Sequence, residues 1–236
     1  MVTQKTINSA QYYDSIADEY MRVREKRNSY LHKIDSIIIE DFHMSAKSIL
    51  DVGAGDGSRG MKIFQSINAD KICMVEESKE MVKNIERDER INIYPGSIQT
   101  FQSQQSFDLV LCLWNVLGHV ETFDGRTQIL KILKNFLSKD GVIAIDFNNR
   151  YNYRHYGIVN VFRNMLKSAF MKEPGWFDIR NHDIDTKVYI HSYFEIKRMI
   201  SLAGLRIKSL RIVDYDNGDE YRNLFKGQFL FYLQSK

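Results

Sequence analysis

Short runs of apolar, mostly β-branched residues recur between residues 48 and 147, and they lack the apolar–polar alternation of a half-exposed strand. Continuous apolar runs of this length are typical of strands in a parallel sheet that is covered on both faces. The pattern predicts strands at Ser48 to Val52, Lys71 to Glu76, Asn92 to Tyr94, Phe107 to Leu113 and Val142 to Phe147.

The segments between these runs repeat their apolar residues at helical spacing, at Arg59 to Ile67, Lys79 to Arg87 and Gln128 to Leu137. The last leads into Ser138 to Gly141, which we expect to be a loop because its glycine suits the turn out of a helix. Alternating strands and helices imply right-handed βαβ units in an open, doubly wound sheet. Ligands of such sheets bind beyond the carboxyl ends of the strands, so function is expected in the loops that follow them.

Both ends of the chain extend this α/β core. Residues 9–42 place apolar and aromatic side chains at helical spacing, which predicts one or two helices. After Asn148 the rhythm breaks, in a stretch rich in Tyr, Asn, Arg and His, and it resumes with a helix and two strands that are expected to form an antiparallel edge. We predict one α/β domain, a three-layer sandwich with a mostly parallel sheet, divided into a helical lid (1–45), a ligand-binding core (46–149), an insert (150–190) and a C-terminal helix with strands (191–236).

Composition narrows the class of protein further. The 236 residues are 44% hydrophobic and carry a formal net charge of +3, with the basic residues spread along the chain, so charge gives no strong signal for a nucleic-acid partner. No apolar run approaches the roughly 20 residues that cross a bilayer, which predicts a protein without a membrane span. Cys73 and Cys112 fall inside buried strands, as expected of core residues in a reducing cytoplasm.

The first predicted strand ends at Asp51 and runs into Gly53-Ala54-Gly55-Asp56-Gly57. Alternate glycines let the backbone turn sharply and approach a ligand near the next helix. Gly55, Gly57 and Gly60 also satisfy the dinucleotide pattern GxGxxG. However, aspartates at the mouth of a diphosphate cradle would repel the anion, whereas they would favour the ammonium and sulfonium charges of a sulfonium amino acid.

A second carboxylate supports a nucleoside ligand. Glu76 ends the second predicted strand and lies 19 residues after Gly57 (76 − 57 = 19). A carboxylate at this distance accepts hydrogen bonds from ribose hydroxyls. Its neighbour Glu77 is the less favoured candidate for binding the ribose, since a negative charge there also suits the start of a helix.

The motifs ILDVGAGDG, MVEESKEM, YPGSIQTF, SFDLVLCLWNVLGHV, LKNFLSKDGVIAIDF and YFEIKRMISLAGLRI together resemble those of class I S-adenosylmethionine-dependent methyltransferases of the small-molecule type. The resemblance implies S-adenosyl-L-methionine as cofactor and S-adenosyl-L-homocysteine as product. It runs from about Tyr12 to the C-terminus and leaves the insert unmatched. The cofactor-binding residues that it implies are Tyr20, Arg24, Asp51, Gly53, Ala54, Gly55, Asp56, Glu76, Glu77, Met81, Ser97, Ile98, Leu113 and Trp114.

Methyl transfer is an in-line displacement, so the protein chiefly aligns the reactants and excludes water. A base helps when the acceptor is a hydroxyl or an ammonium, and His119 in the loop after the fourth predicted strand is the first candidate. Asn115 is the candidate for orienting the acceptor, and Tyr13 for closing over the reacting groups from the lid. The alternative for His119 is packing against the next helix, and for Tyr13 amphipathic core packing.

The polar and aromatic cluster after the fifth predicted strand is expected to recognise the substrate, through Asn149, Arg150, Tyr151 and Tyr153, with His191 facing the cleft. Arg150 suits a carboxylate or phosphate on the acceptor, and the alternative is a surface loop. No metal is expected, because the loop after the fourth strand lacks the carboxylate that metal-dependent relatives use.

The acceptor itself is left open. We expect transfer to a nitrogen or oxygen of a small molecule. Alternatives are an RNA- or protein-directed methyltransferase, a non-catalytic S-adenosylmethionine-binding regulator and an NAD-dependent oxidoreductase. The sequence does not define an oligomeric state.

Overall fold

The computed structural model describes residues 5–6, 8–181 and 184–236; the remainder, at the start of the predicted lid and inside the predicted insert, lies outside the described residues. The helices are α1 (Ser9–Ile16), α2 (Tyr20–Glu25), α3 (Asn28–Phe42), α4 (Ser58–Ile67), α5 (Lys79–Asn84), α6 (Phe123–Asn135), α7 (Tyr153–Tyr156), α8 (Ile158–Phe170) and α9 (Tyr193–Leu202), with 3-10 helices η1 (Ala17–Glu19) and η2 (Val116–His119). The strands are β1 (Lys5–Thr6), β2 (Ser48–Val52), β3 (Lys71–Glu76), β4 (Ile91–Pro95), β5 (Phe107–Cys112), β6 (Leu137–Phe147), β7 (Trp176–Asn181), β8 (Ile184–Tyr189), β9 (Leu205–Val213), β10 (Glu220–Tyr221) and β11 (Gln228–Ser235).

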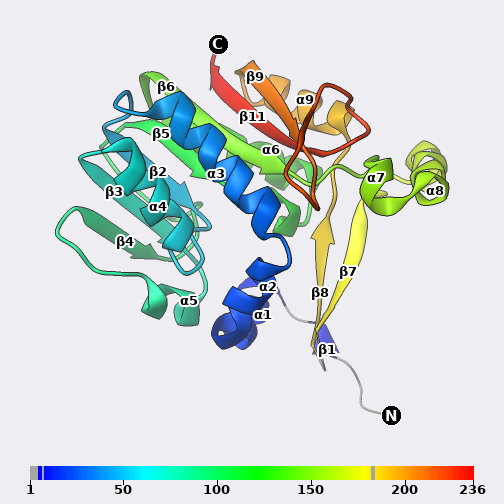
Figure 1. The fold of residues 1–236 in the computed structure, drawn as a ribbon, viewed down its shortest axis with the longest axis horizontal. Coiled ribbons are helices and arrows are strands. Elements are labelled where there is room, and N and C mark those ends of the chain that lie inside the picture. The colour runs from blue at the N-terminus through cyan, green and yellow to red at the C-terminus, as the bar shows by residue number, and fades with distance from the viewer. Residues whose placement is uncertain (1–4, 7, 182–183) are drawn as a thin grey trace.

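The main sheet has eight strands in the order β10-β9-β11-β6-β5-β2-β3-β4 (Figure 1). Strands β4, β3, β2, β5 and β6 are parallel, and β11 pairs antiparallel with both β6 and β9. The predicted mostly parallel sheet with an antiparallel C-terminal edge is therefore confirmed. From β2 the chain proceeds to β3 and β4 on one side and then to β5 and β6 on the other, so the strand order reverses between β2 and β5.

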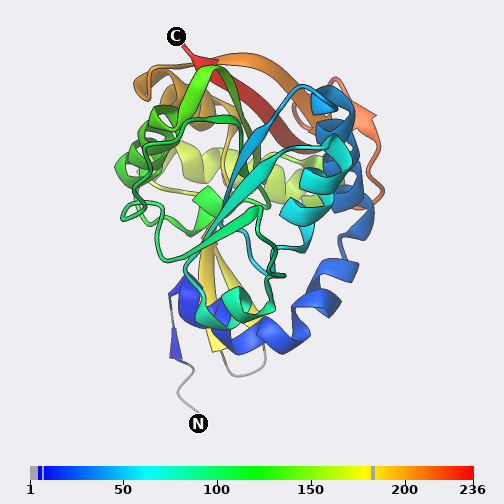
Figure 2. The same ribbon diagram turned by 90° about the vertical axis from the view of Figure 1, so that its left-hand side faces the viewer.

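Alternate residues of the central strands enter two separate cores, which makes the three layers. Ile49 of β2 packs with α3 and α4, whereas the next residue, Leu50, packs with α6 and α9. Figure 2 shows α3 and α4 on one side of the sheet and α6 on the other. Both faces of β2 are buried along its whole length, which explains why its sequence has no polar alternation.

One sequence prediction about local structure is wrong. Ser138 to Gly141 is not a loop, because β6 begins at Leu137 and includes all four residues. A Cβ on Gly141 would lie 2.7 Å from the carbonyl oxygen of Phe107, so this glycine permits close approach of β5 and β6. The insert also has regular structure, since it forms α7, α8 and an antiparallel hairpin of β7 and β8, to which β1 adds a third, parallel strand.

Candidate active site

A cavity of about 270 Å³ opens at the carboxyl ends of the central parallel strands. The loops that follow β2, β3, β4 and β5 all contribute to it, and α1 and η2 close its sides. It lies where the strand order reverses, the usual ligand site of a doubly wound sheet. The predicted site residues that line it are Tyr13, Tyr20, Gly53, Gly55, Glu76, Glu77, Ser97, Ile98, Leu113, Trp114 and His119.

The loop after β2 needs glycine at two positions. Glycine permits the backbone conformation there, and it leaves room for the neighbouring side chains. Gly53 has φ +69° and Gly55 has φ +60°, values that residues with a side chain rarely adopt. A Cβ on Gly53 would lie 2.7 Å from Val116 Cγ2, and one on Gly55 would lie 3.1 Å from Tyr20 Oη. The cavity wall is therefore built directly against this turn.

Gly60, the third glycine of the dinucleotide pattern, has a different role. A Cβ on Gly60 would overlap Oδ2 of Asp51, which is 5% exposed and points toward α4. Burial raises the pKa of the Asp51 carboxyl to about 7, although nearby Arg59 lowers it. Asp51 does not line the cavity. Gly60 makes room for a buried carboxyl and not for a phosphate.

Asp56 is also directed away from the cavity. It accepts a hydrogen bond from Ser58 N at 3.1 Å and pairs with Arg24 Nη1 of α2 at 3.3 Å. Asp56 and Arg24, both predicted to bind the cofactor, thus contact each other and hold α2 beside the glycine turn. Of the other predicted cofactor residues, Ala54 packs against the core of α3 and α4, and Met81 is fully buried beneath α1.

Glu76 is held with its carboxylate at the cavity. Its Oε2 accepts from Gly55 N and its Oε1 from Ser78 N, both at 2.8 Å. Burial raises the pKa of this carboxyl, and the two N–H donors oppose that effect. Each oxygen keeps a further lone pair for hydroxyl groups of a ligand.

Two residues that follow Glu76, Ser78 and Glu80, also hold α1 in place. Ser78, fully buried at the start of α5, donates from Oγ to Asp14 of α1 at 2.6 Å, and Asp14 also accepts from Glu80 N at 3.1 Å. Asp14 was not among the predicted site residues. Helical spacing identified the buried side of α1 but gave no signal for a polar contact made on another side.

Tyr13 of α1 and His119 of η2 meet at the cavity wall. Tyr13 Oη lies 3.2 Å from His119 Nε2, and the two rings pack edge to face with centroids 5.5 Å apart. Burial lowers the pKa of His119 to about 4, and burial raises the pKa of Tyr13. At neutral pH this is an uncharged imidazole beside an uncharged phenol.

The turn between β5 and η2 is held in a strained conformation. Trp114 and Asn115 have φ +71° and +57°, and each non-glycine residue in this region costs about 1–3 kcal/mol. Asp146, at the end of β6, accepts from Asn115 N at 2.7 Å and from Tyr30 Oη at 3.0 Å. The Asn115 side chain donates to Tyr189 O at 3.2 Å and is 2% exposed, so it braces this turn and does not reach the cavity.

The predicted substrate cluster lies away from the cavity. Arg150 is 1% exposed and donates to Glu195 Oε2 at 3.0 Å and to Ile190 O at 3.1 Å. Asn149 is also buried and donates to two backbone carbonyls of the segment before β11. Arg150 thus connects the end of β6 to Ile190 and α9, and Asn149 connects it to the segment before β11.

The other three members also make contacts within the scaffold. Tyr151 Oη is 2.8 Å from Ser168 Oγ of α8, and Tyr153 begins α7. His191 is fully buried, with ring centroids 5.0 Å from those of Phe147 and Tyr189. Burial lowers the pKa of His191 well below its usual value.

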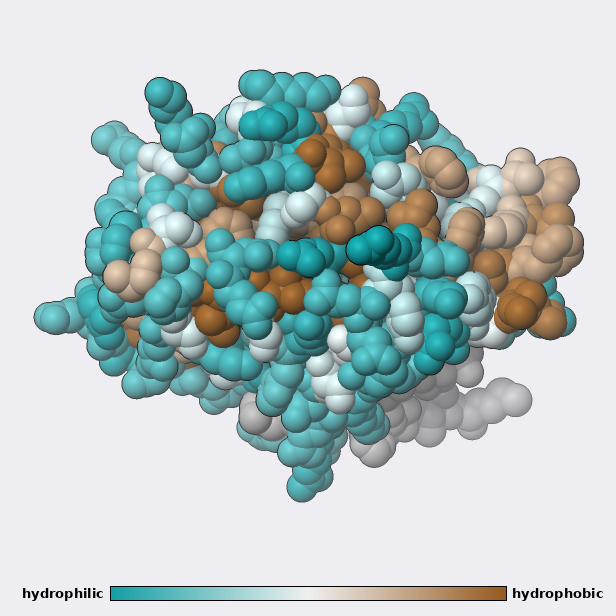
Figure 3. All heavy atoms as spheres, turned by 45° about the horizontal axis from the view of Figure 1, so that its top comes forward, coloured by the Kyte–Doolittle hydropathy of each residue, from teal (hydrophilic) through white to brown (hydrophobic). Residues whose placement is uncertain are grey.

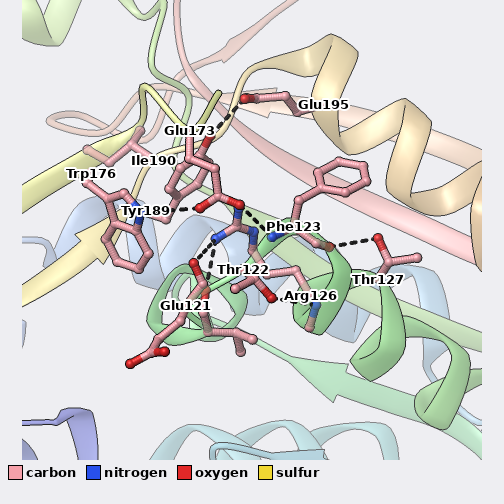
Figure 4. Close-up of polar contacts among 12 residues, drawn as sticks. Glu121, Thr122, Phe123, Arg126, Thr127, Glu173, Trp176, Tyr189, Ile190 and Glu195 are labelled. Atoms are coloured by element: carbon pink, nitrogen blue, oxygen red, sulfur yellow. Dashed lines mark hydrogen bonds and ion pairs between the residues drawn. The ribbon is translucent and has the colours of Figure 1, made fainter. Parts of the chain in front are cut away.

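A buried network connects the insert to the loop that carries His119 (Figure 4). Arg126 of α6 is 1% exposed, donates to Val120 O at 2.8 Å and lies 3.4 Å from Glu173 Oε1. Glu173, just before β7, accepts from Phe123 N at 2.7 Å and so satisfies the first turn of α6. The Arg126 guanidinium lies over the ring of Tyr189, with Arg126 Cζ 3.9 Å from the ring centroid. Sequence reasoning missed this network, because its acidic partner lies in the insert, where no periodicity was apparent.

Over residues 5–6, 8–181 and 184–236, no three His, Cys, Asp or Glu side chains are grouped as a metal would require. Within that same part of the chain, no helix has the length and apolar character needed to span a membrane.

Comparison with known proteins identifies the class. Residues 49–141 match the family model described as a methyltransferase domain. The chain is 28% identical over 201 residues to a ubiquinone biosynthesis O-methyltransferase of Rickettsia akari, covering 79% of this chain and 73% of that one. The chain is an S-adenosylmethionine-dependent methyltransferase with a Rossmann-like fold.

Solved structures share the fold at low sequence identity. An S-adenosylmethionine-dependent methyltransferase from Clostridium acetobutylicum has a TM-score of 0.62 at 14% identity, covering 97% of this chain and 99% of that one. The sugar N-methyltransferase KedS8 from Streptoalloteichus sp. also gives 0.62 at 14% identity, covering 93% and 92%. The S-adenosylmethionine-bound amino pentose methyltransferase CalS10 from Micromonospora echinaspora gives 0.60 at 14% identity, covering 90% and 95%.

Proposed function

We propose that this methyltransferase acts on a nitrogen or oxygen of a small-molecule acceptor, and that the acceptor reacts beside Tyr13 and His119. The observation that carries the proposal is the position of this pair. It faces the same cavity as the glycine turn and Glu76, so one enclosed space offers a nucleoside site and a proton acceptor.

The residues around the cavity fit S-adenosylmethionine. Glu76 would hold the ribose hydroxyls through its remaining lone pairs, and the turn at Gly53 and Gly55 would leave room for the methionine part. Ser97 and Ile98, after β4, would flank the adenine. When bound, the cofactor supplies an electrophilic methyl group on a positively charged sulfur.

The residues of the chain would supply positioning and a proton acceptor. His119 is uncharged at neutral pH, and its Nε2 is in hydrogen-bond contact with Tyr13 Oη. A hydroxyl would give up its proton as it is methylated, and an ammonium would give up its proton before methylation. That proton would pass to Tyr13 Oη while the Tyr13 proton passes to His119 Nε2. Tyr13 of α1 would also orient that imidazole. The rings of Tyr20 and Trp114, whose centroids are 5.7 Å apart, would exclude water.

The names of similar proteins agree with a small acceptor but differ on the atom methylated. The Rickettsia akari relative is named an O-methyltransferase and KedS8 a sugar N-methyltransferase. We favour oxygen, because the relative with the higher sequence identity is the O-methyltransferase and a neutral imidazole is suited to a hydroxyl proton.

Calorimetric titration with S-adenosylmethionine, S-adenosylhomocysteine and NAD tests the cofactor, and heat from NAD alone would overturn the proposal. Turnover on a panel of phenols, hydroxy acids and amino sugars tests the acceptor. His119→Ala should lower kcat by about 10²-fold or more while leaving the cofactor Kd within about twofold. His155→Ala, at a histidine on α7 outside the cavity, is the matched control. Unchanged turnover in the His119 variant would leave His119 with a packing role.

A further inference from the structure

The insert helix α8 exposes its apolar side chains. Ile158 is 73% exposed, Phe162 61% and Phe170 87%, and three further members of the same face are also exposed: Val159, Met165 and Leu166. Figure 3 shows the hydrophobic patch over α8 at the right-hand end of the molecule. At about 100° per residue these positions share one sector of roughly 140° on the helix. This sector is the apolar face of α8.

The helix packs on the protein with its other side. Its buried residues are Val161 and Asn164, and Ser168 bonds Arg150 and Tyr151 beneath it. An amphipathic helix of a globular protein normally turns its apolar stripe toward the core and its polar residues toward water. In α8 only Val161 of the apolar residues is buried, beside the polar Asn164 and Ser168, and the apolar face points outward. This arrangement indicates a partner outside this domain.

The charged residues of α8 are all of one sign. Arg163 and Lys167 follow Phe170 around the helix circumference, and both are exposed. Lys172 lies just past the end of the helix, and the α8 sequence IVNVFRNMLKSAF contains no acidic residue. A helix with an aromatic and aliphatic face bordered by Lys and Arg is the pattern of helices that lie in a membrane interface.

Charge and size both argue against a second copy as the occupant. Antiparallel pairing of two α8 helices about a dyad would bring Arg163 and Lys167 beside the same residues of the other copy, where like charges repel. A helix of 13 residues is about 20 Å long and about 10 Å wide, so the face covers on the order of 200 Å², against about 800 Å² per partner in a stable interface. An anionic lipid surface complements these basic residues, and binding to it does not require such an interface area.

We infer that α8 is an interfacial helix by which this methyltransferase docks on an anionic phospholipid surface. The apolar face enters the region between headgroups and acyl chains, and Arg163 and Lys167 contact lipid phosphates. The inference is independent of the proposed acceptor, because α8 does not line the cavity.

The test is flotation of the full chain with vesicles of phosphatidylcholine alone, and of phosphatidylcholine mixed two to one with phosphatidylglycerol. We expect binding to the mixed vesicles that weakens with added salt. Phe162→Ser with Phe170→Ser should lower the partition coefficient at least about tenfold. Met44→Ser, at an exposed apolar residue beyond the end of α3, should leave it unchanged. Arg163→Gln with Lys167→Gln should remove the preference for the anionic vesicles.

Titration with S-adenosylmethionine shows that each variant is folded, because these substitutions lie outside the cavity. A wild-type chain that stays unbound to both vesicles would overturn the inference, as would equal binding by the Phe162 and Phe170 variant. A wild-type dimer that this variant converts to a monomer would assign the face to a second copy and also overturn it.

Discussion

Gly60→Ala tests the assignment of Gly60 as space for Asp51. In an unobstructed helix the change from Gly to Ala stabilises by up to about 1 kcal/mol. Here the new Cβ overlaps a buried carboxyl, and overpacking a core costs about 1–3 kcal/mol. The net expectation is a loss of roughly 1–2 kcal/mol, which in a chain of this size lowers Tm by about 2–8 °C.

Thermal unfolding of four proteins measures the effect: wild type, Gly60→Ala, Asp51→Ala and the double variant. In the Asp51→Ala background the obstruction is gone, so Gly60→Ala should become neutral or stabilising. The reasoning fails if Gly60→Ala alone is as stable as wild type, or if it destabilises both backgrounds equally.

The other predictions concern single residues of the site and scaffold. Glu76→Ala should weaken S-adenosylmethionine binding more than about tenfold by calorimetry, while Glu77→Ala at the neighbouring carboxylate should change it less; equal affinities would move the ribose contact elsewhere. Because burial raises the pKa of Asp51 to about 7, its contribution to stability is present at low pH and is lost as pH rises toward that value. Asp51→Asn should therefore gain stability relative to wild type as pH rises from about 4 to about 7 in urea unfolding, and parallel pH curves would contradict this. Arg150→Met should lower stability by about 2 kcal/mol or more without changing the acceptor KM; normal stability with a raised KM would return Arg150 to substrate recognition. Since burial lowers the pKa of His119 to about 4, turnover should not show a break near the usual histidine pKa of about 6.5 in a pH profile.

The parallel core was readable from the sequence because burial on both faces leaves a strong local pattern. The bounds of β2 and β3 agree with the predicted ones, and the residues that line the cavity follow directly from the strand ends. A loop after a strand in this fold has little freedom in where it lies. Gly53, Gly55 and Glu76 were therefore found by position alone.

The insert was not readable, for two physical reasons. The apolar face of α8 is exposed, so its spacing does not report which side packs on the domain. Arg150 and Asn149 are polar residues beside a strand end, which suggests recognition, but buried partners occupy them. Whether a polar side chain meets a ligand or another part of the chain depends on contacts between residues far apart in sequence.

Glu173 of the insert satisfies the first turn of α6, and Arg126 of α6 holds the loop of His119. The insert and the loop that carries His119 are therefore held together, even though α6 and β6 separate them in sequence. Anyone seeking a new acceptor by exchanging this insert between relatives would have to transfer the start of α6 with it. An insert grafted without a carboxylate at the position of Glu173 would leave the first turn of α6 without this acceptor and Arg126 without this partner. The loop that carries His119 would then be less firmly held.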